Sequence, residues 1–382
     1  MRILITTIHD DLHAHTVAAV LRQRGHSVTL LHHADFPTRQ TLSLALDDAG
    51  VTLHLGGAGL PGHDPRDYDV VWNRRHATPT PDAQVAEEDQ RFTARELREA
   101  SRTLWQCTGT QAFWVNPEPA LVRAQNKAAQ LVKARELGLA IPATLIGNDP
   151  AAIRAFLARH PGRTIYKPFT PGDWMEQGEL HMLYTASVDA AMLPADGLLQ
   201  ACPGIYQERV DKQFEVRATF MGNTCAAIRI DSQQTAHGQL DWRRAQESET
   251  MPAGVIDVPL HVRARCRRLM QRMDLVFGCF DFIVTPEGEW VFLEVNEAGQ
   301  FLFLEAWCPE LPMLDMFCRF IESRDPDFLY APVAAPARFE AWVKDDAVTE
   351  SLQWARDLHL GPAPRWLPAG SAKAEVSAET PV

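Results

Sequence analysis

The sequence has no C-x-x-C pair, no long apolar run and no excess of basic residues. Its seven cysteines are an odd number without close pairing, so neither a disulfide framework nor a zinc knuckle is indicated. No stretch approaches the roughly 20 apolar residues that cross a bilayer, which excludes an integral membrane protein. The N-terminal segment also lacks the apolar region of a signal peptide, so we expect a cytoplasmic protein whose thiols are reduced.

Acidic residues outnumber basic ones by 49 to 37, which gives a net charge of −12. A surface of this charge repels polyanions, so nucleic acid is not an expected partner. The length of 382 residues is too great for one compact core and predicts two or three domains.

The first hundred residues have the pattern of a βαβ unit. A strand is expected at 3–6, a helix at 16–23 and a second strand at 27–31, which together predict a parallel sheet. A further strand at 70–72 is followed by Arg74 and Arg75. Two adjacent guanidinium groups can bind carboxylates there, and a solvated strand end is the alternative.

The central part begins with a helix that we expect to start at Pro117, behind an Asn116 cap, and to stop at Gly138. Lys127 lies off its apolar stripe, and the alternative for it is a solvent-facing lysine. A strand at 163–168 carries Lys167 near its end. The loop at 170–183 contains glycines, and such a loop can fold over phosphates and donate main-chain hydrogen bonds to them.

A strand at 214–221 alternates between apolar and polar residues, so Glu215 and Arg217 share one face. The Gly222-Asn223 pair predicts a hairpin turn into the strand at 224–230. A structural salt pair is the alternative to a functional role for the acid and the arginine.

The segment 280–296 reads FDFIVTPEGEWVFLEVN and predicts a hairpin that turns at Glu287-Gly288. Counting back from that turn pairs Asp281 with Glu294, with both carboxylates on one face, where like charges repel. A divalent cation relieves the repulsion, and Asn296 lies on the same face as a third oxygen ligand. Three hard oxygens suit Mg²⁺, which keeps its other positions for water and phosphates.

These residues resemble the motifs of the ATP-grasp carboxylate ligases, and among them the microviridin-type peptide maturases, or graspetide synthetases. The general motifs are Asn126-Lys127, YKP at 166–168, QERV at 207–210, EVR at 215–217, Asp281 and EVN at 294–296. The closer ones are WNRR, NPEPALVRAQNK, EVRATFMGN before IDSQ, DWR at 241–243 and FLEVNEAGQFLFLE. Together they extend from the N-terminus to about residue 330.

The resemblance implies a role for each matched position. Lys127 and Lys167 would contact the phosphates of ATP, main-chain groups around Glu208 and Val210 would hold the adenine, and Glu215 would hold the ribose. Asp281, Glu294 and Asn296 would bind Mg²⁺, Arg217 would face the phosphates or the acyl phosphate, and Arg243 would approach the reacting acid. With Arg229, these two arginines form the expected catalytic set, because guanidinium groups bind carboxylates through paired hydrogen bonds.

The implied fold class is α/β (α+β), an ATP-grasp fold with an N-terminal Rossmann-like pre-ATP-grasp domain. We expect that first domain at 1–115, the ATP-grasp domain at 116–330, and a C-terminal helix with a disordered tail at 331–382.

The implied activity is an ATP-dependent ligation that uses ATP and Mg²⁺. The side chain of an Asp or Glu in a precursor peptide becomes an acyl phosphate, which a Ser or Thr hydroxyl or a Lys amine of the same peptide displaces to close a ring. The alternatives are a glutathione-synthetase-like ligase that joins an amino acid to a small molecule or a protein terminus, and a catalytically silent peptide-binding protein. A precursor peptide is the expected partner, and the sequence leaves a homodimer open.

Overall fold

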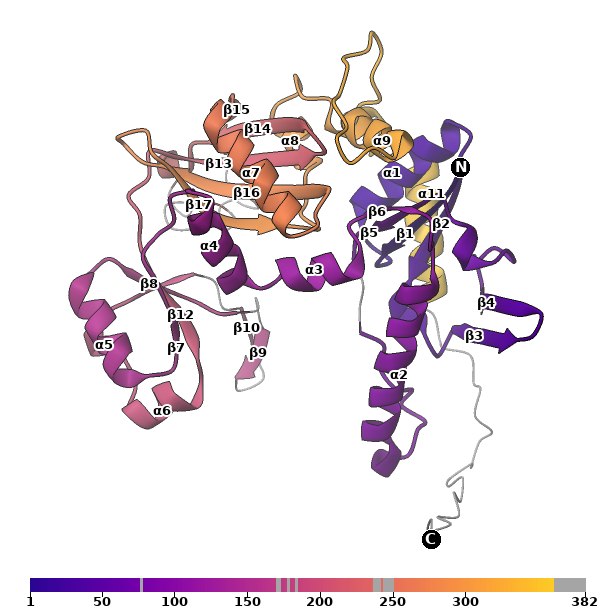
Figure 1. Cartoon of the computed structure of the whole chain (residues 1–382), viewed down its shortest axis with the longest axis horizontal. Coiled ribbons are helices and arrows are strands. Elements are labelled where there is room, and N and C mark those ends of the chain that lie inside the picture. The colour runs from indigo at the N-terminus through magenta and orange to yellow at the C-terminus, as the bar shows by residue number, and fades with distance from the viewer. Residues whose placement is uncertain are drawn as a thin grey trace. The chain divides into compact units, whose positions relative to one another are not determined.

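The computed structural model describes residues 1–75, 78–169, 173–176, 179–182, 185–235, 242 and 251–360 (Figure 1). The chain folds as two compact units. The first comprises Met1–Glu118 together with the chain from Pro312 onward, and the second comprises Pro119–Leu311. Within the described ranges, no helix combines the length and the apolar character needed to cross a membrane.

The first unit is built on a parallel four-stranded sheet in the order β2-β1-β5-β6. Its strands are β1 (Arg2–Thr7), β2 (Ser27–His32), β5 (Val70–Asn73) and β6 (Phe113–Val115). Helix α1 (Leu12–Gln23) connects β1 to β2, and the side chain of Asp11 caps it by accepting from the main-chain N–H of His13. The βαβ unit expected from the sequence is therefore present.

The first unit also contains a separate hairpin and a long helix. Strands β3 (Gln40–Asp47) and β4 (Gly50–Gly57) form a separate antiparallel hairpin, and the long helix α2 (Glu87–Cys107) precedes β6 (Figure 1). Helix α2 buries residues only in its second half, namely Leu97, Ser101, Leu104 and Trp105.

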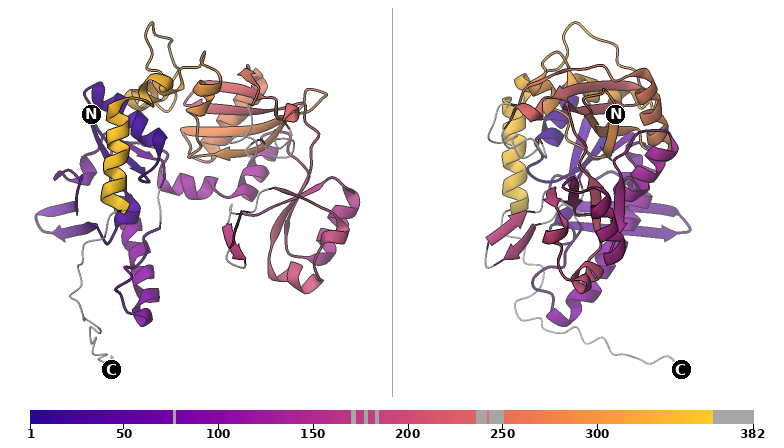
Figure 2. Two further views of the ribbon diagram at one scale, coloured as in Figure 1. Left: turned by 180° about the vertical axis from the view of Figure 1, so that it is seen from behind. Right: turned by 90° about the vertical axis from the view of Figure 1, so that its left-hand side faces the viewer.

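The C-terminal helices return to the first unit: α9 (Met313–Ser323), α10 (Phe339–Trp342) and α11 (Asp346–Leu360). Helix α11 runs beside α1, as the two views of Figure 2 and the contacts of these helices agree. Phe317 of α9 packs against Trp72 of β5 with ring centroids 4.6 Å apart. The compact unit thus resumes at residue 312, whereas the sequence placed 312–330 with the second domain. The tail at 361–382 lies outside the described residues.

A buried carboxylate fixes α9 within the first unit. Asp315 has no exposed side-chain surface and accepts hydrogen bonds from Arg24, Arg319, Tyr330 and the main-chain N–H of Ala337. Burial by itself raises the pKa of this carboxyl, but the hydrogen bonds outweigh it and hold the pKa below its ordinary value.

The second unit contains a smaller antiparallel sheet in the order β11-β8-β12-β7. Its strands are β7 (Thr144–Gly147), β8 (Thr164–Lys167), β11 (Ala186–Val188) and β12 (Gly204–Glu208). Helices α5 (Pro150–Arg159) and α6 (Asp196–Ala201) pack on one face through residues such as Phe156 and Leu199, which belong to the same buried cluster as Tyr206. Strands β9 (Asp173–Glu176) and β10 (Glu179–Met182) pair as a hairpin.

The larger sheet of the second unit has the order β15-β14-β13-β16-β17 and is antiparallel throughout. Its strands are β13 (Phe214–Met221), β14 (Thr224–Ile230), β15 (Ala253–Val255), β16 (Phe277–Val284) and β17 (Trp290–Asn296). Helices α4 (Lys127–Glu136) and α7 (Leu260–Arg272) cover one face, where Val216, Phe280 and Phe292 are buried, and α8 (Phe303–Trp307) follows β17. The expected turn at Gly222-Asn223 joins β13 to β14.

The single helix expected from residue 117 to 138 is wrong. The structure has α3 (Glu118–Ala124) and α4, separated at Gln125 and Asn126. The side chain of Asn126 accepts from the main-chain N–H of Ala129 at 2.9 Å, so it starts a new helix as an N-cap. This break places Lys127 in the first turn of α4.

Candidate functional site

A row of charged residues crosses the larger sheet of the second unit. The register places Arg217 of β13 opposite Asp281 of β16, and Asp281 opposite Glu294 of β17. Directly opposite residues of antiparallel strands project from the same face, so the three side chains form one line. Lys127 of α4 extends it, with Nζ 3.5 Å from Oε2 of Glu294. Two carboxylates therefore lie between two cations.

The predicted pairing of Asp281 with Glu294 is confirmed, although the turn differs from the one we expected. Thr285 bonds to Glu289, so the loop has three residues, and Gly288 takes the left-handed conformation with φ +85°. This shifts the register by one residue near the turn. A bulge between Asp281 and Phe282 shifts it back, because Phe282 faces Phe292 while Asp281 faces Glu294.

Arg217 and Asp281 form a buried ion pair. Nη1 of Arg217 lies 2.9 Å from each carboxylate oxygen of Asp281, and Nη2 donates to the main-chain oxygen of Gln300 at 2.9 Å. Both side chains are almost fully buried, which strengthens hydrogen bonds between charged groups. Arg217 thus forms its salt pair across strands with Asp281. Glu215, the acid on the same strand, instead bonds to Lys212 and Ser232.

The donor set of this face fits Mg²⁺. Nδ2 of Asn296 donates to Oδ2 of Asp281 at 3.0 Å, so the amide lies beside the carboxylate as expected. In the described part of the chain, no three His, Cys, Asp or Glu side chains gather in a metal-binding group. Two carboxylates and one amide are nevertheless hard oxygen donors, and Mg²⁺ in nucleotide enzymes needs few protein ligands because phosphates and water complete its shell.

A third carboxyl follows these residues in the chain. Burial raises the pKa of Glu297 above its ordinary value, and the nearby charge of Glu294 acts in the same direction. Hydrogen bonds from its own main chain and from Gln125 oppose the shift only in part.

Lys167 lies on the smaller sheet and belongs to a chain of hydrogen bonds. Its Nζ donates to Oε1 of Gln207 at 2.8 Å, and Nε2 of Gln207 donates to Oγ1 of Thr144 at 3.0 Å. The amide of Gln207 thereby fixes the end of the lysine side chain. From the sequence, we assign no role to Gln207. Its position one residue before Glu208 on an alternating strand nevertheless places its side chain on the opposite face to that of Glu208.

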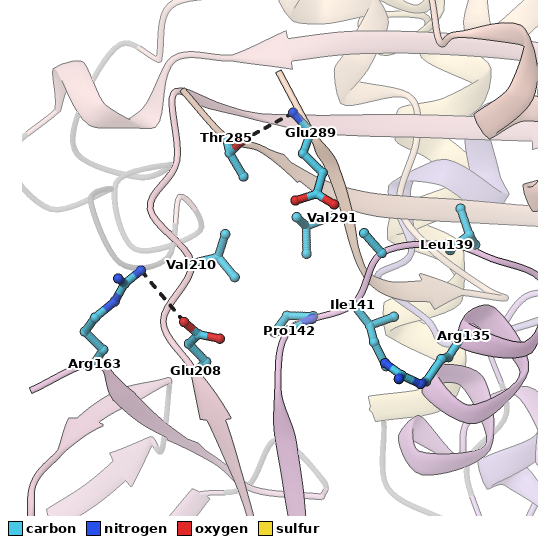
Figure 3. A pocket seen from close by; sticks show the side chains of 11 residues that line it. Arg135, Leu139, Ile141, Pro142, Arg163, Glu208, Val210, Thr285, Glu289 and Val291 are labelled. Atoms are coloured by element: carbon cyan, nitrogen blue, oxygen red, sulfur yellow. Dashed lines mark hydrogen bonds and ion pairs between the residues drawn. The ribbon is translucent and has the colours of Figure 1, made fainter. Parts of the chain in front are cut away.

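Glu208 and Val210 line an open pocket of about 400 Å³ beside the end of β12 (Figure 3). Figure 3 shows Arg163 reaching toward Glu208, with the nitrogen and oxygen 3.9 Å apart. The side chain of Glu208 thus points away from Gln207 and Lys167. Its main-chain N–H donates to the oxygen of Ala143, so main-chain contact of this residue with a base would use the carbonyl oxygen.

Glu215, the expected ribose ligand, is buried and already bonded. Its Oε1 accepts from Oγ of Ser232 at 2.8 Å and from Nζ of Lys212. The carboxylate is on the same strand face as Arg217, two residues along β13.

Arg229 does not belong to this site, which corrects the sequence-based assignment. It pairs with Val216, whose side chain is in the helix-covered core, and its guanidinium lies 4.2 Å above the ring of Phe214. Arg229 therefore projects from the opposite face to Arg217, because directly paired residues share a face. The face from which Arg229 projects is set by the register in which β14 pairs with β13. Asp241 and Arg243 lie outside the described residues, and of the DWR segment only Trp242 is described.

Arg74 and Arg75 are adjacent in the first unit but differ in their exposure to solvent. Arg74 is 1% exposed, and its Nε lies 3.2 Å from Oδ2 of Asp11. Arg75 keeps 40% of its side chain exposed and lies 3.6 Å from the same oxygen. Burial by itself raises the pKa of Asp11, but the charges of Arg74, His13 and Arg75 and the hydrogen bond from Thr7 outweigh it and lower the pKa. Only Arg75 thus offers a guanidinium to solvent.

Comparison with known proteins identifies the fold. Neither a protein-family model nor a curated protein matches the chain. The RiPP-associated ATP-grasp ligase of Chryseobacterium gregarium, solved with ADP and a leader and core peptide, is 24% identical, with a TM-score of 0.75 over 86% of this chain and 99% of that one. The macrocyclase MdnB of Microcystis aeruginosa MRC is 26% identical, with a TM-score of 0.70 over 84% and 98%. The ATP-grasp ligase PsnB, complexed with minimal precursor, Mg and ADP, is 24% identical, with a TM-score of 0.66 over 85% and 96%.

Proposed function

We propose that this chain, which has the fold of the ATP-grasp ligases, is an ATP-dependent ligase that closes rings in a ribosomal precursor peptide. The observation that carries this proposal is the row formed by Arg217, Asp281, Glu294 and Lys127. A row of two carboxylates between two cations suits a metal-bound polyphosphate, because the carboxylates hold the metal and the cations hold the phosphates. ADP, Mg and precursor peptides in the similar structures support it.

In this proposal Asp281, Glu294 and Asn296 would hold Mg²⁺, which neutralises the charge of the phosphates during transfer. Lys127 reaches the same face from α4 and would contact phosphate oxygens. Lys167 would contact them from the smaller sheet, where Gln207 holds its ammonium group in place. The protein thus mainly orients the reactants and screens their charge.

The proposed reaction has two steps. A carboxylate oxygen of the peptide attacks the γ-phosphorus of ATP, the bond to the bridging oxygen breaks, and ADP leaves. A hydroxyl or amine of the same peptide then attacks the acyl carbon and releases inorganic phosphate, and its proton passes to solvent. Each ring therefore consumes one ATP, and the peptide loses the mass of one water molecule.

We also propose the cytoplasm as the location of the enzyme. ATP and ribosomal peptides are available there, and none of the seven cysteines, all of which lie in the described part of the chain, forms a disulfide.

Mass spectrometry of candidate peptides tests the proposal. Peptides that contain Glu or Asp with Thr, Ser or Lys are incubated with the protein, ATP and Mg²⁺, and ADP release is followed in parallel. We expect ADP release together with the loss of one water per ring, and neither with Glu294→Gln. ADP release with free amino acids and unchanged peptides would instead establish a glutathione-synthetase-like ligase. Peptide binding without ADP release would establish a silent binding protein.

A further inference from the structure

Gln130 of helix α4 has a side-chain amide whose hydrogen bonds are all made inside the protein. Its Oε1 accepts from the main-chain N–H of Val295 at 2.8 Å. Its Nε2 donates to the main-chain oxygens of Val295, at 2.9 Å, and of Ala124. The residue is 3% exposed, so these bonds are shielded from water. A buried amide whose donors and acceptor are all bonded is held in one orientation.

The partner of this amide stands between two of the expected metal ligands. Val295 separates Glu294 from Asn296 on β17, which is the edge strand of the larger sheet. The outer main-chain groups of an edge strand have no neighbouring strand to bond with. Gln130 supplies the missing partner, because its amide accepts from the N–H and donates to the C=O of one residue, as a peptide group of a neighbouring strand would. Three residues earlier, the oxygen of Ala140 bonds the N–H of Phe292 in the same way.

Helix α4 thus contacts β17 at two neighbouring residues, Glu294 and Val295. Lys127, in its first turn, reaches the carboxylate of Glu294, and Gln130, one turn later, holds the main chain of the next residue. Residues three apart lie on the same side of a helix, so both contacts come from one rigid element. The Asn126 cap fixes where that element begins.

We propose that Gln130 is a positioning residue, which sets the place of Glu294 and Asn296 relative to Asp281 and Lys127 by holding the main chain between them. The inference rests on the proposed function, since it concerns the magnesium site of that function. Gln130 itself touches neither metal nor nucleotide. Its loss would leave the ligands present but poorly aligned, so the affinity for metal would fall while the affinity for nucleotide alone would not.

The test compares two substitutions in the same helix. Gln130→Met keeps the length of the side chain and removes both hydrogen bonds to Val295. Leu131→Ala, the matched control, removes buried packing of α4 and leaves the amide of Gln130 in place. For each full-length protein, we would measure the melting temperature, the affinity for Mn²⁺ in the presence of ADP by electron paramagnetic resonance, and the affinity for ADP in EDTA by calorimetry.

We expect Gln130→Met to weaken Mn²⁺ binding by about tenfold or more, as loss of a residue that orients metal ligands does, and to leave the affinity for ADP in EDTA unchanged. Leu131→Ala should lower the melting temperature without changing the affinity for Mn²⁺. Equal losses of Mn²⁺ affinity in the two variants would overturn the positioning role. If Gln130→Met does not fold, Gln130→Ala, which removes the same hydrogen bonds and adds no charge, gives the same comparison.

The wild-type protein separates this inference from the function on which it rests. If wild-type protein binds no Mn²⁺ with ADP, the proposed function is wrong. If wild-type and Gln130→Met bind it equally well, the proposed function stands and the role of Gln130 is wrong.

Discussion

One nitrogen of Arg217 binds both carboxylate oxygens of Asp281, at 2.9 Å each, inside the larger sheet of the second unit. Removing one partner of a buried pair leaves the other charge uncompensated, so Arg217→Met and Asp281→Asn should each destabilise the protein by about 3–5 kcal/mol. The double variant should lose less than the sum, because it buries no lone charge. Urea unfolding of the four proteins measures this coupling. Additive losses would mean that the two side chains do not stabilise one another.

Glu294→Gln and Asn296→Ala should abolish ATP turnover and leave the fold intact. Each removes an oxygen ligand or its charge, and Mg²⁺ tolerates little rearrangement of its octahedral shell. Circular dichroism would check the fold and ADP release the turnover. Near-normal ADP release by either variant in the presence of a reactive peptide would remove that residue from the metal site.

Lys167→Ala should weaken the binding of ATP by about 1.5–3 kcal/mol, as loss of a hydrogen bond from a charged group does. Lys344→Ala, at an exposed lysine of the first unit, is the matched control and should leave the affinity unchanged. Calorimetric titration with a non-hydrolysable ATP analogue measures both. An unchanged affinity in Lys167→Ala would place Lys167 outside the nucleotide site.

Arg75→Gln should raise the KM for the peptide and leave the affinity for ATP unchanged, because the exposed guanidinium of Arg75 can dock a carboxylate of the substrate. Arg74→Gln should instead lower the melting temperature, since Arg74 is buried against Asp11. Steady-state kinetics with a reactive peptide and thermal unfolding separate the two effects. A KM that does not change in Arg75→Gln would contradict the docking role.

Asp315 should make stability depend on acidity. Its pKa in the folded protein is below the ordinary value of 3.8, so its contribution is complete above that value and is lost as the pH falls through the lowered pKa. Asp315→Asn should cost about 3 kcal/mol at neutral pH, because Arg319 loses its carboxylate partner and Arg24 keeps only Glu322. It should also flatten the dependence of the unfolding free energy on pH below about 4. An equally steep acid transition in the variant would show that Asp315 does not titrate in this range.

The sequence predicted local patterns well and long-range register poorly. The alternation in 214–221 placed Glu215 and Arg217 on one face, and the βαβ signals located the first sheet. The hairpin pairing was correct because a three-residue loop and a bulge shift the register in opposite directions. Neither feature was foreseen, since both depend on how β17 packs against its neighbours.

The errors have similar causes. Arg229 was grouped with Arg217 because arginine suits a carboxylate, but the pairing of β14 with β13 sets its face, and residue type carries no signal for that. The break at Asn126 was missed because apolar residues continue on both sides of it, so the periodicity persists. Gln130 had no signal of its own, since a buried glutamine is recognisable only when the strand that it bonds is known.

The return of the chain to its first unit at Pro312 affects the order in which the two units can fold during synthesis. Phe317 of α9 is needed to cover Trp72, so the first unit cannot complete its core when its N-terminal part leaves the ribosome. The 193 intervening residues (311 − 118) take roughly 10–40 s to synthesise at about 5–20 residues per second. During that interval the second unit can fold while β5 still exposes Trp72. The earliest sequence of this protein is therefore among the last to become protected, and a nascent chain halted before residue 312 would be open to chaperones and proteases at its own N-terminus.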